Sequence, residues 1–193
     1  MKISGAVLAG GASRRMGRDK ARIEVGGLTL LERGLNALAP LCDELMVVAR
    51  EPEPYRVLAG VRARPVADRF PAGGALAGLH AAVDGAAHSA CLVLAVDMPV
   101  VQRELLALLA ARAGEADVVV PRVAGRFEPL CAVYGKTCLP AMQRQLEAAE
   151  DFTILRFYDE VRLLEIGEEE LRGADPELRS FFNVNRPEDL DRL

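Results

Sequence analysis

Short apolar runs rich in β-branched residues alternate along this chain with segments of helical periodicity. This pattern predicts an α/β fold: a single-domain, Rossmann-like three-layer sandwich with a mainly parallel sheet covered by helices. A chain of 193 residues is long enough to bury one full core, so a second domain is not required. The predicted strands are Ile3–Leu8, Leu45–Ala49, Val61–Val66, Cys91–Val96, Val118–Pro121 and Leu130–Tyr134, and the predicted helices are Leu30–Leu38, Gln102–Ala113 and Thr137–Glu147.

The segments that lack these periodicities are predicted to connect or close the fold. Glu51–Pro54 and Gly167–Pro176 are rich in charge and in Pro or Gly, which is typical of surface loops. The tail Asn185–Leu193 is predicted to form a short closing helix, because Pro187 suits its first turn and the acidic residues that follow suit its positive end.

Composition excludes several classes of partner. The formal net charge is −4, which argues against sequence-independent binding to nucleic acid. The longest apolar stretch, Ala90–Val101, contains Asp97 and is too short to cross a membrane, so we expect a cytoplasmic protein. The four cysteines form no Cys-x-x-Cys pair, and with only two histidines the chain shows no zinc pattern, so free thiols in a reducing compartment are expected.

A glycine-rich loop follows the first predicted strand and carries concentrated positive charge. Gly10 and Gly11 allow a ligand to approach the backbone closely, and they leave N–H groups free to face anionic oxygens. The cations Arg14, Arg15, Arg18 and Lys20 follow within ten residues. This chemistry predicts a polyphosphate site. The alternative is a solvated turn with surface arginines.

Two aspartates follow predicted strands, at the edge of a parallel sheet where ligands bind. Asp97 ends a fully apolar run and could supply a carboxylate to Mg²⁺ that also binds phosphate oxygens, or it could cap the helix predicted near Gln102. Asp68 is a second candidate, with a simple turn-forming role as its alternative. The small residues of Gly73–Leu79 could admit a base or sugar at a helix start, or could serve tight helix packing.

Several of these motifs resemble those of known nucleotidyltransferases. The stretch Leu8–Lys20 is similar to their glycine-rich signature, Val96–Pro99 to their magnesium-holding Asp-Met-Pro segment, and Gly74–Gly78 to a segment beside their nucleotide pocket. Two further stretches, Glu128–Tyr134 and Phe181–Leu190, resemble those of molybdenum cofactor guanylyltransferases. The likeness spans nearly the whole chain, and it implies that the predicted α/β sandwich is of the nucleotidyltransferase type.

The resemblance implies an enzyme that transfers GMP from GTP to the terminal phosphate of molybdopterin and releases pyrophosphate. It implies a nucleotide-binding part at about residues 1–100 and an acceptor-binding part at about 101–193. Lys20, Arg15 and Asp97 would be catalytic, with Asp97 holding Mg²⁺. Binding of the nucleotide and the acceptor would involve Leu8, Ala9, Gly10, Gly11, Ser13, Arg14, Lys20, Asp68, Gly74, Leu76, Gly78, Asp97, Asn183 and Asn185. Without the resemblance, the two asparagines read as turn residues.

The expected partners are GTP, molybdopterin and, after transfer, apo-molybdoenzymes or their chaperones; a monomer is expected. One alternative is CMP transfer to molybdopterin or to an isoprenoid or sugar phosphate. The paired glycines Gly10 and Gly11 favour guanine, because cytidylyl-transferring relatives more often carry Ala-Ala-Gly there. Another alternative is a nucleotide-binding chaperone without catalysis. The chain departs from the family at Ala49 and Arg50, where an Asn often follows the strand.

Overall fold

The computed structural model describes residues 1–10, 19–55, 57–58, 61–70 and 72–193, and a mainly parallel sheet forms its centre, as predicted. The strand order is β10-β9-β11-β8-β1-β4-β7, with β12 pairing with β9. Strand β11 runs antiparallel to both β8 and β9, β10 is antiparallel to β9, and the other pairs are parallel. The bounds are β1 (Ser4–Leu8), β4 (Glu44–Ala49), β7 (Arg64–Ala67), β8 (Ala90–Ala95), β9 (Val118–Val123), β10 (Arg126–Phe127), β11 (Cys131–Gly135) and β12 (Leu163–Ile166).

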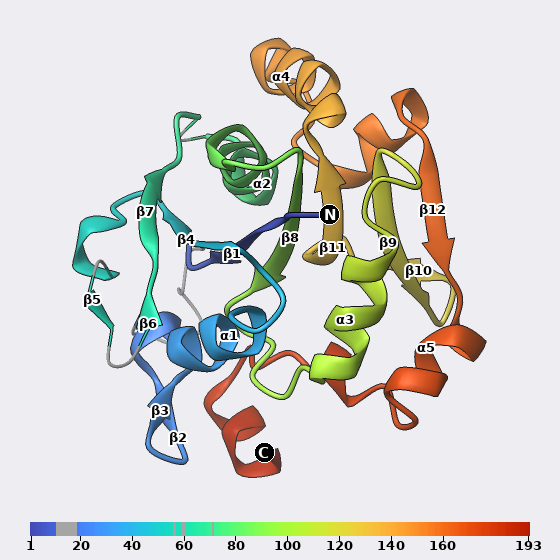
Figure 1. Cartoon of the computed structure of the whole chain (residues 1–193). Coiled ribbons are helices and arrows are strands. Elements are labelled where there is room, and N and C mark those ends of the chain that lie inside the picture. Colours follow the sequence, from blue (N-terminus) through green and yellow to red (C-terminus); the bar gives the residue numbers. More distant parts are fainter. Residues whose placement is uncertain (11–18, 56, 59–60, 71) are drawn as a thin grey trace.

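Helices cover both faces of this sheet (Figure 1). Helices α1 (Leu30–Leu38), α3 (Arg103–Ala111) and α5 (Glu168–Ala174) lie on one face, and α2 (Gly74–Gly85) and α4 (Leu139–Ala148) on the other. Short 3-10 helices are η1 (Lys20–Arg22), η2 (Glu53–Tyr55), η3 (Lys136–Cys138), η4 (Ile154–Glu160), η5 (Arg179–Phe181) and η6 (Pro187–Arg192).

Strand β8 is buried on both faces, which explains why its sequence is apolar at every position and does not alternate with polar residues. Leu92 and Leu94 pack in the core on the side of α1 and α3, whereas Cys91 and Val93 pack in the core on the side of α2 and α4. All four side chains are fully buried or nearly so. A central strand covered on both faces needs apolar residues at every position, so the apolar run extends over the whole of β8.

Helix α1 has the bounds that its leucine spacing predicts, and its sequence contains a complete N-terminal cap. The Thr29 hydroxyl accepts a hydrogen bond from the Glu32 N–H, while the Glu32 carboxylate accepts one from the Thr29 N–H. The chain reaches this cap through a hairpin of β2 (Glu24–Val25) and β3 (Leu28–Thr29). Gly26 and Gly27 turn this hairpin with φ of 60° and 80°, values that favour glycine.

Two predicted elements differ from the structure, and a third is confirmed. The single strand Val61–Val66 is wrong: β6 (Val61–Arg62) pairs with β5 (Val57–Leu58), and the separate strand β7 pairs with β4 at the sheet edge, where Pro65 is tolerated. The loop Gly167–Pro176 is also wrong, because α5 forms there with three glutamates in its first turn and Leu171 fully buried. The predicted closing helix is confirmed: it is a 3-10 helix, and Pro187 is its first residue.

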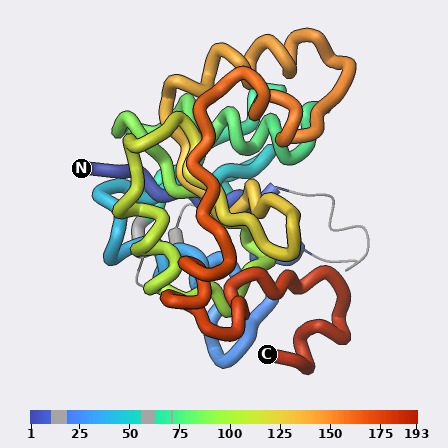
Figure 2. Tube along the Cα trace, turned by 90° about the vertical axis from the view of Figure 1, so that its right-hand side faces the viewer, coloured from blue at the N-terminus to red at the C-terminus, as the bar shows by residue number. Residues whose placement is uncertain are grey.

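The fold gathers one end of the sheet into a common edge. Strands β1, β4, β7 and β8 are parallel neighbours, so their carboxyl ends lie together. Figure 2 shows β1 running from left to right and the C-terminal segment (red) at lower right, on the side toward which β1 points. Within the described ranges, none of the helices combines the length and the apolar character needed to cross a bilayer.

Candidate active site

A pocket of about 780 Å³ opens at the common carboxyl edge of these strands. This volume lies within the range of small-molecule and cofactor sites. Leu8, Ala9 and Gly10 line it directly after β1, and the backbone N–H of Ala9 is fixed on the Val48 carbonyl at 2.8 Å. Lys20, Asp68, Gly74, Gly78 and Asp97 also line the pocket, so most of the predicted site residues converge on one cavity.

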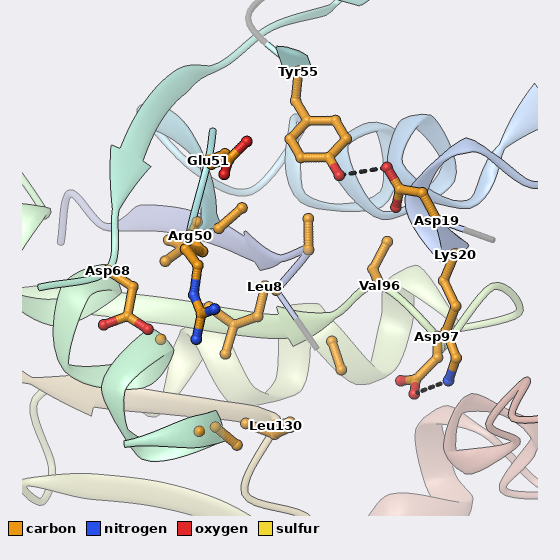
Figure 3. Close-up of a pocket in the computed structure, with 18 of the residues that line it drawn as sticks. Leu8, Asp19, Lys20, Arg50, Glu51, Tyr55, Asp68, Val96, Asp97 and Leu130 are labelled. Atoms are coloured by element: carbon orange, nitrogen blue, oxygen red, sulfur yellow. Dashed lines mark hydrogen bonds and ion pairs between the residues drawn. The ribbon is translucent and has the colours of Figure 1, made fainter. Parts of the chain in front are cut away.

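Lys20 and Asp97 form an ion pair at one end of this pocket (Figure 3). The Lys20 Nζ lies 3.2 Å from the Asp97 Oδ2, although the two residues are 77 positions apart in the sequence. The same ammonium donates a hydrogen bond to the Asn185 Oδ1 at 3.0 Å. The side chains of Lys20 and Asp97 are 17% and 24% exposed, so the pair is partly shielded while still reaching the cavity. A cation and a carboxylate thus meet at one end of the cavity.

Asp97 does not cap helix α3, which was the alternative role considered for it. Helix α3 takes Gln102 as its N-cap, without a side-chain cap bond, and the Gln102 N–H donates to the Ser180 hydroxyl at 2.9 Å. The Asp97 carboxylate instead faces Lys20. Its backbone carbonyl accepts a 2.8 Å hydrogen bond from the Val184 N–H, which brings the C-terminal segment to this end of the pocket.

Asp19 and Tyr55 support the turn that carries Lys20. The Asp19 carboxylate caps η1 by accepting a 3.0 Å hydrogen bond from the Ala21 N–H, and it also accepts one from the Tyr55 hydroxyl. Burial and the adjacent Asp19 carboxylate raise the pKa of Tyr55 to about 12, so the phenol stays protonated and remains the donor at neutral pH. Lys20, at the start of η1, therefore sits on a locally fixed backbone.

Asp68 lies at the opposite end of the pocket from the ion pair (Figure 3). Its Oδ1 accepts a 2.7 Å hydrogen bond from the Phe70 N–H, so it forms a turn and lines the cavity at once. The side chain of Arg50 extends between Asp68 and Leu8. A cationic residue therefore lines the cavity directly after β4.

Two glycines stand where helix α2 begins at the pocket wall, and each is required for a different structural reason. A Cβ at Gly73 would approach the Leu146 Cδ2 to 2.5 Å, so this position serves close packing. Gly74 has a φ of +57°, and a Cβ there would meet no atom within 4 Å, so its backbone conformation is the requirement. Gly74 and Gly78 both line the cavity one helical turn apart, which leaves the positive end of α2 accessible to a ligand.

Some predicted residues lie elsewhere or outside the described ranges. Leu76 is fully buried in the core between α2 and the sheet, because a residue two positions from Gly74 and Gly78 faces away from them on a helix. Asn183 donates a 3.4 Å hydrogen bond to the Phe181 carbonyl and, like Leu76, is absent from the described lining of the pocket. Four predicted residues fall outside the residues that the structure describes: Gly11, Ser13, Arg14 and Arg15.

Sequence reasoning missed four polar residues of the pocket wall: Asp19, Arg50, Glu51 and Tyr55. Asp19 lies in the same motif as Lys20, and Arg50 follows a strand end directly, so both positions carried a signal. Glu51 and Tyr55 belong to a segment predicted to be, or to border, a surface loop, and no local pattern indicated that this segment folds back over the pocket.

The donor set at this site fits a metal ion that is shared with a ligand. Among the described residues, no group of three or more His, Cys, Asp or Glu side chains is placed to hold a metal. Mg²⁺ commonly binds proteins through one or two carboxylates and completes its shell with phosphate oxygens and water. The Asp97 carboxylate, beside Lys20 at one end of the pocket, suits that mode of binding.

Comparisons with known proteins bear on the family and the fold of this chain. The family model described as a MobA-like NTP transferase domain matches residues 5–162. A relative named probable molybdenum cofactor guanylyltransferase, from Pelotomaculum thermopropionicum, is 40% identical over 98% of this chain and 91% of its own length. The molybdenum cofactor guanylyltransferase of Desulfosudis oleivorans is 34% identical over 98% and 93%. The crystal structure of molybdopterin-guanine dinucleotide biosynthesis protein A from Archaeoglobus fulgidus superposes with a TM-score of 0.83 at 32% identity, covering 98% of this chain and 95% of that one.

Proposed function

The chain belongs to the MobA-like NTP transferase family, and we propose that it transfers GMP from GTP to the terminal phosphate of molybdopterin. The products are the guanine dinucleotide form of the cofactor and pyrophosphate. The names of the similar proteins support this reaction. The observation that carries the proposal is the meeting of Lys20 and Asp97 at 3.2 Å inside the pocket, where the carboxyl ends of β1 and β8 converge.

In the proposed reaction, an oxygen of the terminal phosphate of molybdopterin attacks the α-phosphorus of GTP. A new P–O bond forms as the bond from the α-phosphorus to the bridging oxygen breaks, and pyrophosphate leaves with that electron pair. The attacking oxygen is already anionic, so no general base is required. Catalysis then depends on alignment of the reactants and on stabilisation of charge at the phosphoryl oxygens.

The pocket residues are suited to aligning the reactants and to stabilising charge on the phosphoryl oxygens. The backbone around Gly10 and the N-terminal end of α2 offer N–H groups to the nucleotide, and the Lys20 ammonium is placed to stabilise charge that develops on the transferred phosphoryl group. Arg14 and Arg15 belong to the same motif and would add positive charge. Asp68 lies at the other end of the cavity from Lys20, where the nucleoside would bind, and Gly78 adds no side chain to the wall.

Mg²⁺ belongs to this proposal as an ion held jointly by Asp97 and the triphosphate. When bound, it would neutralise charge on the phosphate oxygens and hold the leaving pyrophosphate in place. The acceptor would approach from the side of Asn185, because this residue from the second half of the chain reaches Lys20 of the first half. Residues 1–100 would thus bind the nucleotide and residues 101–193 the acceptor.

Pyrophosphate release, measured with each nucleoside triphosphate in turn, with Mg²⁺, and with or without molybdopterin, tests donor and acceptor together. The proposal expects release only with GTP and molybdopterin together. Release with CTP instead would identify a cytidylyltransferase. Nucleotide binding without release from any triphosphate would favour a chaperone that carries the cofactor without chemistry. A melting experiment adds an independent measure, because a nucleotide that binds the folded state raises its apparent stability.

A further inference from the structure

The C-terminal strap, which we define as residues 183–189, is hydrogen-bonded to both residues of the Lys20–Asp97 ion pair. Val184 is fully buried, and its N–H donates to the Asp97 carbonyl at 2.8 Å. Asn185 follows and accepts a 3.0 Å hydrogen bond from the Lys20 ammonium. The strap therefore contacts both partners of the pair, one through its backbone and the other through a side chain.

The contact with Asn185 limits the freedom of Lys20. A lysine side chain is long and flexible, and its ammonium has three donors that can turn toward water. Here two of those donors are directed at fixed acceptors, the Asp97 Oδ2 and the Asn185 Oδ1. A cation that is held before the ligand arrives loses less freedom on binding, which is the basis of electrostatic preorganisation.

Asp189 fixes the backbone of the residue that holds Lys20. Its Oδ2 accepts hydrogen bonds from the N–H groups of Asn185 and Arg186, each at 2.8 Å. These two backbone bonds hold the pKa of Asp189 below its ordinary value, so the carboxylate is ionised at neutral pH.

A capping role alone does not account for this arrangement. The start of η6 requires only the bond to Arg186, which is the N-cap residue, and that bond is part of a capping box. The bond to Asn185 lies one residue further from the helix and fixes the peptide whose side chain touches Lys20.

We propose that Asp189 is a positioning residue for catalysis: it holds the Asn185 peptide so that the Asn185 side chain keeps the Lys20 ammonium beside Asp97. This inference rests on the proposed function, because it assigns Lys20 the role of stabilising the transferred phosphoryl group. Asp189 acts only through its neighbours and makes no contact with the reacting atoms.

The position of Lys20 can be measured without any ligand. The chain has only three lysines, and the other two, Lys2 and Lys136, are exposed. Selective ¹⁵N-lysine labelling therefore gives three side-chain signals that single substitutions assign. We expect the Lys20 ammonium protons to exchange with water more slowly than the other two, and Asp189→Ala to accelerate that exchange by about tenfold.

Two matched variants separate positioning from folding. Asp189→Asn keeps an oxygen that can accept both backbone bonds, so its Lys20 exchange and turnover should remain close to those of the wild type. Asp191→Ala removes the same charge from the same 3-10 helix and should also leave both unchanged. If Asp189→Asn accelerates Lys20 exchange as much as Asp189→Ala does, or if neither variant changes it, the positioning role is refuted.

Turnover supplies the second measurement, as a double-mutant cycle with Lys20→Ala. Asp189→Ala alone should lower kcat by about tenfold, because a misplaced catalytic group reduces rate strongly. In the Lys20→Ala background the same substitution should have almost no further effect. An equal loss in both backgrounds would overturn the inference. If the wild type itself transfers no GMP, the proposed function fails, while the ligand-free exchange measurement still decides whether Asp189 positions Lys20.

Discussion

Replacing Lys20 with alanine is the most direct test of how the pocket works. The substitution removes an ammonium that lies 3.2 Å from the Asp97 Oδ2 and 3.0 Å from the Asn185 Oδ1. Lys20 and Asp97 are 17% and 24% exposed, so the charge acts in a partly shielded site. At an effective dielectric of about 20, unit charges about 4 Å apart interact by roughly 4 kcal/mol.

That interaction sets the scale of the expected loss. In the transition state the Lys20 ammonium would interact with a phosphoryl oxygen at a similar distance, and its removal would cost most of this interaction energy. Loss of one preorganised donor typically costs about 2.7–4 kcal/mol. At about 1.36 kcal/mol per factor of ten, kcat should fall by about 10²–10³. The folded structure should remain, because Asp97 keeps enough exposure to be hydrated, and the change in unfolding free energy should be about 0–1 kcal/mol.

The assay is the initial rate of pyrophosphate release at saturating GTP and molybdopterin, with a melting curve for each variant. Lys136→Ala is the matched control, because it removes an exposed lysine from another part of the chain and should leave kcat unchanged. A Lys20→Ala enzyme whose kcat stays within tenfold of the wild type would remove this cation from the mechanism. A loss of turnover that is matched by a comparable loss of folded protein would likewise refute the electrostatic explanation.

Three further predictions concern stability. Gly74→Ala should lower the unfolding free energy by about 1–2 kcal/mol in urea titrations, because alanine at a φ of +57° is strained, whereas Gly173→Ala, where φ is not positive and space is open, should not destabilise. Tyr134→Phe should cost about 1–2 kcal/mol in the same assay, since the buried hydroxyl donates to the Pro129 carbonyl at 2.7 Å; an unchanged midpoint would contradict this. Hydrogen bonds from Arg162 hold the pKa of Asp117 well below its ordinary value, so this carboxylate stabilises the fold above about pH 4 and the contribution disappears on acidification. The stability difference between wild type and Asp117→Asn should therefore shrink as melting curves are taken from neutral toward acid pH, and a constant difference would exclude this linkage.

The elements of the central sheet and its main helices were predictable where local pattern and tertiary environment agree. Strand β8 is apolar at every position because both of its faces are buried, and α1 carries its leucine stripe and its capping residues within ten residues of sequence. Prediction failed where local composition was ambiguous. The segment that forms α5 is charged and ends near Pro and Gly, a composition that is also typical of loops. Its helix is stabilised by three glutamates in the first turn and by the burial of Leu171.

The site could be predicted in part for the same reason. Gly10, Asp68 and Asp97 come directly after strands, and the parallel arrangement alone brings strand ends to a common edge. Lys20 was found through the motif to which it belongs and not through a strand end. Leu76 lies in the same motif as Gly74, but helix geometry turns it into the core. A sequence motif shows which residues are adjacent in the chain, but it does not show which face of a helix each side chain occupies.

The sequence by itself determined most of the central strands and main helices and which residue types stand at the strand ends, because those properties depend on neighbours within one or two turns of chain. Only the tertiary structure decided that Lys20 meets Asp97 across 77 residues and Asn185 across 165. Such contacts arise from sheet order and from the docking of the C-terminal strap. Both are set by packing of the whole core, which no local pattern encodes.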